Sequence, residues 1–241
     1  MRSSLRFAWA VLAVPVLLFA WSHAAADPVP GLYISGMDAG DPEPTVWQPN
    51  GQMSGEGQVH YAGTRVADHW ICEFTIDAKA DPWINSVLSI TNTTPTTQTY
   101  TFTVTLPIFP ALPAPTQHGG SMQGGLTNNP NPPNMPAVVA TAGAPLYLGM
   151  IDGVGVLPIY PDPTSFTAVQ DYSSTSIPAV NVLPPTLPSG AVTSTIGIQH
   201  KFTLTAGDSA TFSSIFVVVP EPATLVLLAM GGFAIARRRR V

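Results

Sequence analysis

Residues 99–108, TYTFTVTLPI, decide the fold class of this chain. Four large apolar residues alternate there with four threonines, namely Tyr100, Phe102, Val104 and Leu106 against Thr99, Thr101, Thr103 and Thr105. A period of two places the two sets on opposite faces of a β-strand. The run therefore predicts a half-buried strand with a row of four hydroxyls on its outward face.

The same alternation recurs in other parts of the chain. HWICEFTID (69–77) places Trp70 and the single cysteine, Cys72, on one face, and DPWINSVLSITN (81–92) is rich in β-branched residues. TIGIQHKFTLT (195–205) and SATFSSIFVVV (209–219) alternate in the same way. Gly207 and Asp208 lie between the last two runs, so we expect a hairpin centred on this pair.

The remaining sequence favours strands joined by turns. The chain has 26 prolines and 20 glycines in 241 residues, and no internal segment shows the spacing of an amphipathic helix. We expect an all-β body, an antiparallel β-sandwich with long loops rich in proline and glycine. Met37–Gly57 and Pro110–Pro136 are the two predicted surface loops. A signal helix and a short transmembrane helix are expected to flank this body.

The first 26 residues have the layout of a secretory signal peptide. Arg2 and Arg6 precede an apolar stretch, and Ala24 and Ala26 form a small-residue cleavage site before Asp27. We therefore expect Sec-type export and cutting by signal peptidase. The predicted organisation is a signal peptide (1–26), an exported domain (27–219) and a C-terminal segment (220–241).

Charge and cysteine content exclude several classes of protein. Only Arg65, Lys79 and Lys201 supply positive charge between residues 27 and 219, whereas every acidic residue except Glu221 lies there. Such an acidic body repels nucleic acid, which we do not expect as a partner. With Cys72 alone, no intramolecular disulfide can form, and the alternation at 69–77 predicts a buried thiol rather than a nucleophile.

The C-terminal segment, VPEPATLVLLAMGGFAIARRRRV, has three parts. Pro220, Glu221 and Pro222 precede an uncharged run from Ala223 to Ala236, and a basic cluster follows, Arg237, Arg238, Arg239 and Arg240. A helix of this uncharged run spans roughly 21 Å, which is short for the ~30 Å hydrocarbon core of a bilayer. The arginines would remain cytoplasmic, so the Pro-Glu-Pro tripeptide would face outward.

These three parts, in this order, resemble the PEP-CTERM sorting signal of Gram-negative bacteria. The resemblance implies that a membrane-embedded exosortase recognises Pro220–Pro222 and cuts near it. It also implies transient residence in the inner membrane, then the cell surface or extracellular matrix, and an association with exopolysaccharide and biofilm. The segment also occurs at the end of some ice-binding proteins. A permanent single-span tether is the alternative interpretation.

The body carries little that points to catalysis. It lacks the HExxH, GxSxG and P-loop motifs, and we expect no enzyme activity and no required cofactor. Asp38, Asp41 and Glu43 leave calcium binding open. His60 and His69 could meet if their strands pair, which is a weak signal for a site. His200, on an apolar strand face, is interpreted as a hydrogen-bonded core histidine.

The predicted function is therefore a non-catalytic structural or adhesive role in the extracellular matrix. Two alternatives remain open. An exported hydrolase would need a pocket in which acidic, histidine or serine side chains converge. A protein that binds ice or carbohydrate would use the threonine row at residues 99–105, although a solvent-facing strand explains that row equally well.

Overall fold

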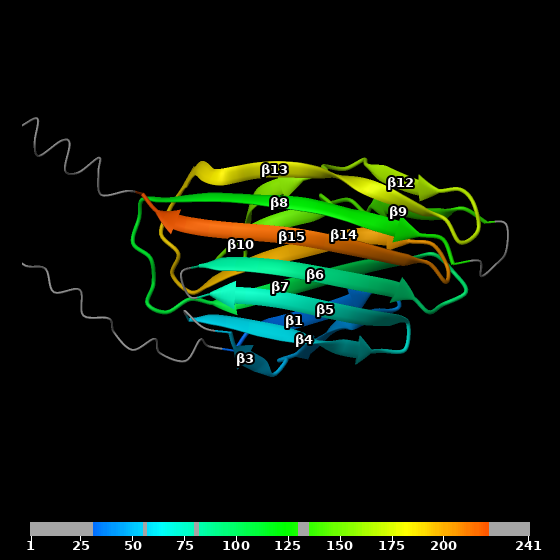
Figure 1. Cartoon of the computed structure of the whole chain (residues 1–241), viewed down its shortest axis with the longest axis horizontal. Helices are drawn as coiled ribbons and strands as arrows, with labels where there is room; N and C mark the ends of the chain where they lie inside the picture. Colours follow the sequence, from blue (N-terminus) through cyan, green and yellow to red (C-terminus); the bar gives the residue numbers. More distant parts are fainter. Residues whose placement is uncertain (1–30, 55–56, 80–81, 130–134, 222–241) are drawn as a thin grey trace, which may run out of the picture.

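The computed structural model describes residues 31–54, 57–79, 82–129 and 135–221. In these ranges the chain forms β-strands β1 to β15 and no helix, and every strand pair is antiparallel. Two sheets lie face to face with the core between them (Figure 1). The prediction of an all-β body with antiparallel sheets is confirmed. Both predicted flanking helices lie outside the described residues, and those residues contain no helix that could span a membrane.

Sheet A has eight strands, in the order β11–β10–β14–β7–β1–β2, with β9 joined to β14 and β12 joined to β9. Its strands are β1 (Tyr33–Asp38), β2 (Asp41–Trp47), β7 (Gln98–Pro107), β9 (Ala137–Thr141), β10 (Tyr147–Ile151), β11 (Val154–Ile159), β12 (Ser165–Ala168) and β14 (Thr195–Leu204). The run that predicted the fold class is β7, in the interior of this sheet.

Sheet B has seven strands, in the order β13–β8–β15–β6–β5–β4–β3. Its strands are β3 (Gly51–Met53), β4 (Gln58–Val66), β5 (Trp70–Lys79), β6 (Trp83–Asn92), β8 (Thr116–Thr127), β13 (Ser174–Ser189) and β15 (Ser209–Pro220). The last strand of the described residues, β15, is paired on both sides, with β8 and with β6.

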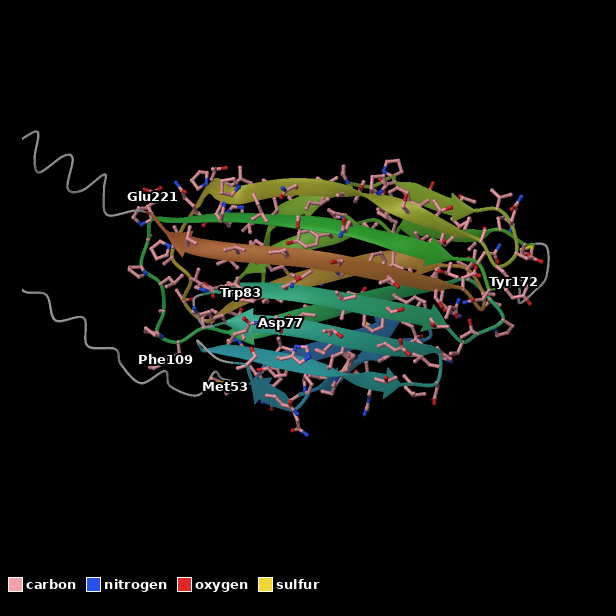
Figure 2. The ribbon with its side chains drawn as sticks, in the orientation of Figure 1. Met53, Asp77, Trp83, Phe109, Tyr172 and Glu221 are labelled. Carbon is pink, nitrogen blue, oxygen red and sulfur yellow. The ribbon has the colours of Figure 1, made fainter. Side chains whose placement is uncertain are left out.

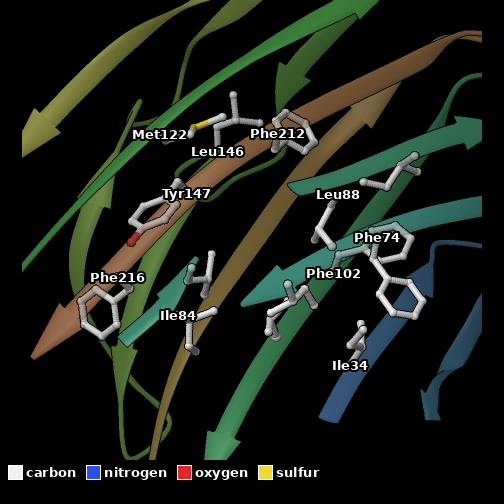
Figure 3. Close-up of a cluster of buried hydrophobic side chains, with 14 of the residues drawn as sticks. Ile34, Phe74, Ile84, Leu88, Phe102, Met122, Leu146, Tyr147, Phe212 and Phe216 are labelled. Atoms are coloured by element: carbon white, nitrogen blue, oxygen red, sulfur yellow. The ribbon is translucent and has the colours of Figure 1, made fainter. Parts of the chain in front are cut away.

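The period-two pattern correctly identifies the buried faces. The four apolar residues of β7 are all fully buried, and Trp70 and Cys72 of β5 are buried as well. Aromatic rings join the two sheets: Trp70 meets the edge of Phe102 at 5.0 Å between ring centroids, and Phe202 meets Phe212 at 4.9 Å. Figure 3 shows buried side chains of both sheets in this core, among them Phe102 of β7 and Phe212 of β15. Each such buried side chain contributes about 1.5–3 kcal/mol to stability.

The predicted hairpin at Gly207 and Asp208 is wrong, although a turn does form there. Gly207 has a φ of 75° and the Asp208 N–H donates to the Thr205 carbonyl at 3.4 Å. However, β14 belongs to sheet A and β15 to sheet B, so the turn carries the chain from one sheet to the other. A two-residue turn signal predicts where the chain reverses, but the partner of each strand is set by long-range packing. Asp152 and Gly153, in contrast, form the two-residue turn of the β10–β11 hairpin.

The two predicted surface loops are also wrong in part. Met37–Gly57 contains the strands β2 and β3, and Pro110–Pro136 contains the twelve-residue strand β8. Far from being a loop, β8 lies between β13 and β15 and pairs with both. Its four glycines hide the alternation on which the prediction relied.

The glycines of β8 allow the neighbouring chain to approach closely. A Cβ atom at Gly124 would lie 2.2 Å from the Thr211 carbonyl oxygen, and one at Gly120 would lie 2.6 Å from the Ile215 carbonyl oxygen. At Gly120 it would also lie 2.7 Å from the Tyr147 hydroxyl, which donates to that same carbonyl at 2.8 Å. These positions exclude side chains, so a strand of low intrinsic β-propensity is required here.

Replacing Gly120 with alanine therefore tests the packing of β8. We expect Gly120→Ala to lower the free energy of unfolding by about 1–3 kcal/mol, because the added methyl overpacks the junction of the two sheets. Gly125→Ala is the matched control, since its nearest atom would lie at 3.9 Å, and we expect no comparable loss. Denaturant unfolding measures both, and an equal loss in the two variants would contradict this packing.

Candidate functional site

The first two residues of the predicted sorting motif continue the last strand of the body. β15 pairs with β8 along its whole length, up to Pro220 opposite Thr116. The Glu221 N–H then donates to the Pro115 carbonyl at 3.1 Å. Glu221 lies at one end of the sandwich, where β15 ends (Figures 1 and 2). No spacer separates the folded sheet from the motif.

A proline fits at position 220 because of the direction in which its nitrogen points. Successive N–H groups of a strand point to opposite sides. The Val218 N–H faces the β6 side, where it donates to the Pro82 carbonyl at 2.9 Å, and the Glu221 N–H faces the β8 side. The nitrogen of Pro220 therefore faces the β6 side, beyond the last β6 pair at Trp83 and Val217. The lack of an N–H at Pro220 therefore removes no hydrogen bond between strands.

The other predicted processing residues lie outside the described ranges. These residues are the signal cleavage site (Ala24, Ala26 and Asp27), Pro222 of the sorting motif and the basic cluster (Arg237, Arg238, Arg239 and Arg240). Their roles remain predictions from the sequence.

Comparison with known families agrees with this assignment. The model of the PEP-CTERM protein-sorting motif matches residues 218–240, from the end of β15 into the arginine cluster. The chain carries a PEP-CTERM sorting signal. This signal implies export and passage through the membrane of a Gram-negative bacterium, with an exosortase as the processing partner. A search of the curated proteins found no match, so the comparisons assign no activity to the body.

A second candidate site is a polar pocket at the end of the sandwich opposite to Glu221. Its cavity volume is about 290 Å³, and Asp38, Glu43, Arg65, Asp68 and His69 are among its lining residues. The carboxylate of Asp38 is almost fully buried and accepts hydrogen bonds from the Gly40 N–H at 2.8 Å and from His69 Nδ1 at 3.1 Å. Sequence reasoning did not find this pair, because thirty residues separate its members along the chain.

The Asp38–His69 pair fixes one tautomer of the imidazole. A carboxylate accepts, so Nδ1 of His69 carries a proton, and in the neutral form of the ring Nε2 is the acceptor. Hydrolases orient a general base in this way. Among the described residues, however, no hydroxyl is hydrogen-bonded to the His69 ring, and the pair alone supplies no nucleophile.

The predicted meeting of His60 and His69 does not occur. β4 and β5 do pair, but His60 lies opposite Asp77 and donates to its carboxylate at 2.8 Å, whereas His69 precedes β5 at the other end. Nor do the described residues contain a group of three His, Cys, Asp or Glu side chains that could hold a metal ion.

The two buried groups that were interpreted as core residues are confirmed as such. Burial, and to a lesser extent the charge of Glu73, raise the pKa of the Cys72 thiol to about 12, so this thiol is not a reactive nucleophile. His200 is fully buried, its Nδ1 donates to the Leu146 carbonyl at 3.0 Å, and its Nε2 accepts from the Ser214 hydroxyl at 3.1 Å. The imidazole thereby links β14 to β15 across the core.

The two sheets differ in what they present to solvent. The threonine row of β7 lies on the outward face of sheet A, but the two neighbouring strands do not continue it. The residues opposite the threonines are Tyr33, Ser35 and Met37 in β1, and Gly197, Gln199, Lys201 and Thr203 in β14. Only Thr203 is a threonine among these neighbours. A single row of hydroxyls gives little support to ice binding through this face.

The outward face of β8, β15 and β6 is a feature that sequence reasoning missed. We call it the neutral face, because none of its side chains is charged. It consists of Trp83, Asn85, Val87, Ser89 and Thr91 in β6, of Gln117, Gly119, Ser121, Gln123, Gly125 and Thr127 in β8, and of Ser209, Thr211, Ser213, Ile215, Val217 and Val219 in β15. Hydroxyls meet across its strands: Thr91 contacts Ser209 at 2.8 Å, and Thr211 donates to Ser89 at 3.1 Å. Trp83 adds an aromatic ring near the end with Glu221 (Figure 2).

Buried histidines make the stability of this body depend on pH. Burial lowers the pKa of His118, and it lowers the pKa of His200 to about 4. The unfolded chain, with a histidine pKa near 6.5, then binds more protons than the folded chain below that pH. We expect stability to be constant above about pH 6.5 and to fall between pH 6.5 and 4, by roughly 3 kcal/mol for His200 alone.

Denaturant unfolding at pH 7 and pH 4.5 tests this expectation. A His200→Phe, Ser214→Ala double variant removes the titrating ring together with the hydroxyl that bonds to it, so its loss of stability on acidification should be smaller than that of the wild type. Equal losses would contradict the assignment. If the variant does not fold, NMR titration of the His200 ring in the wild type gives the same answer, and a normal pKa there would be the contradicting result.

Proposed function

We propose that this chain is an exported, exosortase-processed protein of the cell surface or extracellular matrix. Its role is structural or adhesive, it has no catalysis of its own and needs no cofactor, and it associates with exopolysaccharide in biofilm. The observation that carries the proposal is the sorting signal, whose first residues, Pro220 and Glu221, extend the last strand of the body. A single motif thus links a stable β body to the export machinery.

The neutral face supports the adhesive role. Sugars offer hydroxyls and apolar ring faces, and uncharged hydroxyls, amides and an aromatic ring are suitable partners for both. In an acidic body, an area without charge over three adjacent strands also avoids repulsion from an anionic polymer. Such groups occur on each of the three strands of this face.

Intact-mass analysis of the protein from its host tests the processing. We expect a form that begins at Asp27, after signal peptidase cleavage, and ends near Pro220–Pro222, recovered outside the inner membrane. Matched samples of the membrane and extracellular fractions are compared. A protein that retains Arg237–Arg240 and stays in the membrane would favour the permanent tether and contradict this proposal.

A charge placed on the neutral face tests the adhesive role. Ser213 lies opposite Val87 and Gln123 near the middle of this face. We expect Ser213→Glu to lower retention in the exopolysaccharide fraction about tenfold, since an uncompensated charge in a contact costs at least 1–2 kcal/mol and a carboxylate is also repelled by an anionic polymer. Thr103→Glu, on the outward face of sheet A, is the control and should bind as the wild type does. Loss with Thr103→Glu alone would instead point to the threonine row.

An exported hydrolase is the second candidate function, and the Asp38–His69 pair in its pocket is the observation that favours it. The test compares wild type with His69→Gln on model ester, peptide and glycoside substrates. The primary proposal predicts no turnover above background in either protein. Turnover that requires His69 would establish the hydrolase instead.

A further inference from the structure

An apolar loop lies beside the point where the sorting signal leaves the body. The loop connects β7 to β8 and reads IFPALPAP over residues 108–115. It contains no charged or hydrogen-bonding side chain, and all of its residues except Ile108 and Leu112 are exposed; Phe109 is 64% exposed. Figure 2 shows Phe109 at the same end of the sandwich as Glu221, and Tyr172 at the opposite end.

Backbone hydrogen bonds hold this loop in place. Leu112 and Val192 exchange two bonds at 2.9 and 3.0 Å, and the Ile108 N–H donates to the Ser194 carbonyl at 2.8 Å. The partner segment is itself fixed, because the Asp152 carboxylate accepts from the N–H groups of Thr193, Ser194 and Thr195 at 2.7–2.9 Å. The loop therefore presents Phe109 from a rigid support.

The sequence leaves almost no distance between this loop and the apolar run of the sorting signal. Pro115, the last loop residue, accepts the Glu221 N–H, and the apolar run begins at Ala223, two residues further on. Two extended residues span at most ~7 Å. The polar layer of a bilayer is about as thick, roughly 5–7 Å on each side of the hydrocarbon core. If the run enters the bilayer, Pro115 must lie within or next to the polar layer, and Phe109, at the same end of the sandwich, can reach that layer when the long axis stands upright on the membrane (Figure 2).

Carboxylates lie at both ends of the sandwich. Asp38, Asp68, Asp171 and Asp208 lie at the end away from the loop, where β1 ends, β5 begins and β15 begins. Asp77, Asp152 and Glu221 lie nearer the loop; Asp152 accepts hydrogen bonds from the N–H groups of Thr193, Ser194 and Thr195, and Asp77 accepts one from His60. The twelve residues of β15 separate the two ends by about 40 Å, several times the ~8–10 Å over which salt screens charges. Tyr172 at that far end is more exposed than Phe109, at 83%, but it adjoins Asp171.

We propose that the loop 108–115, with Phe109 at its exposed tip, rests in the interfacial layer of the membrane as long as the sorting signal is uncut. The occupant of this surface is the lipid headgroup region, and the inference rests on the proposed function in taking the apolar run as membrane-inserted. Burial of one phenylalanine is worth only about 1.5–3 kcal/mol, too little for stable binding alone. The contact therefore depends on the covalent link to the tail and ends when the tail is cut.

A nitroxide label at position 109 tests this contact. The chain with its tail intact is placed in vesicles of phosphatidylethanolamine and phosphatidylglycerol, with Phe109→Cys labelled and Tyr172→Cys as the matched control. The native Cys72 is buried and stays unlabelled, which the unsubstituted protein verifies. Relaxation by oxygen, which concentrates in lipid, is compared with relaxation by a water-soluble nickel chelate.

We expect the ratio of oxygen to nickel relaxation at position 109 to exceed the ratio at position 172 severalfold. Shortening the chain to end at Glu221 should return the two ratios to equality. Water-like ratios at both positions with the tail inserted would overturn the proposal, as would a lipid-like ratio at 109 without the tail. A label at 109 that is water-like in vesicles but shielded in host membranes would also overturn it, in favour of contact with the exosortase.

The same experiment separates this inference from the proposed function. If the tail inserts and position 109 is water-like, while intact mass in the host shows a normal cut, only the inference fails. If position 109 is lipid-like but the host never removes the tail, the processing proposal fails and the inference stands.

Discussion

The pairing of β15 with β8 is the interaction on which the rest of the structure depends. It runs over twelve residue pairs, from Ser209 opposite Thr127 to Pro220 opposite Thr116. Without it, sheet B would separate into β13–β8 and β6–β5–β4–β3. β15 also supplies the Ile215 carbonyl that binds Tyr147 and the Ser214 hydroxyl that binds His200, so the same strand fastens sheet B to sheet A.

Much of the fold could be predicted from local alternation, and the failures have a common physical cause. In β5, β7, β14 and β15, large apolar side chains alternate with polar or smaller ones. The positions that this alternation assigns to the core are the positions that are buried in the structure. β8 escaped prediction because Gly120 and Gly124 are selected by close backbone contacts that only the folded chain creates. The turn at Gly207 was found, but not its crossing between sheets, because sheet membership depends on distant partners.

The candidate sites likewise differ in whether they depend on local sequence or on residues far apart in the chain. The three-part tail is a local signal, so it could be recognised without any structure, and the match to residues 218–240 agrees with it. The joining of Pro220 and Glu221 to sheet B, the neutral face and the Asp38–His69 pair all depend on residues far apart in sequence. They become visible only when strand order and register are known.

Together these features describe a body organised along its long axis. At one end the chain passes from β15 into the sorting signal beside an uncharged loop, and at the other end several carboxylates gather around a polar pocket. The absence of a spacer means that the start of the motif, which an exosortase would recognise, adjoins a folded sheet. Release of the Glu221–Pro115 hydrogen bond alone would free the motif from the sheet at little cost, since one such bond is worth about 1 kcal/mol.

Hydrogen exchange of the amides at the end of β15 tests most directly whether the sorting motif continues the sheet. In the chain with its tail intact, we expect the Val219 N–H to be protected nearly as well as those in the middle of β15. The Glu221 N–H should be less protected, yet measurably slower than an unstructured amide. Exchange of both amides at the unstructured rate would contradict the account, because the motif would then lie on a free linker and nothing would hold the end of the body at the membrane.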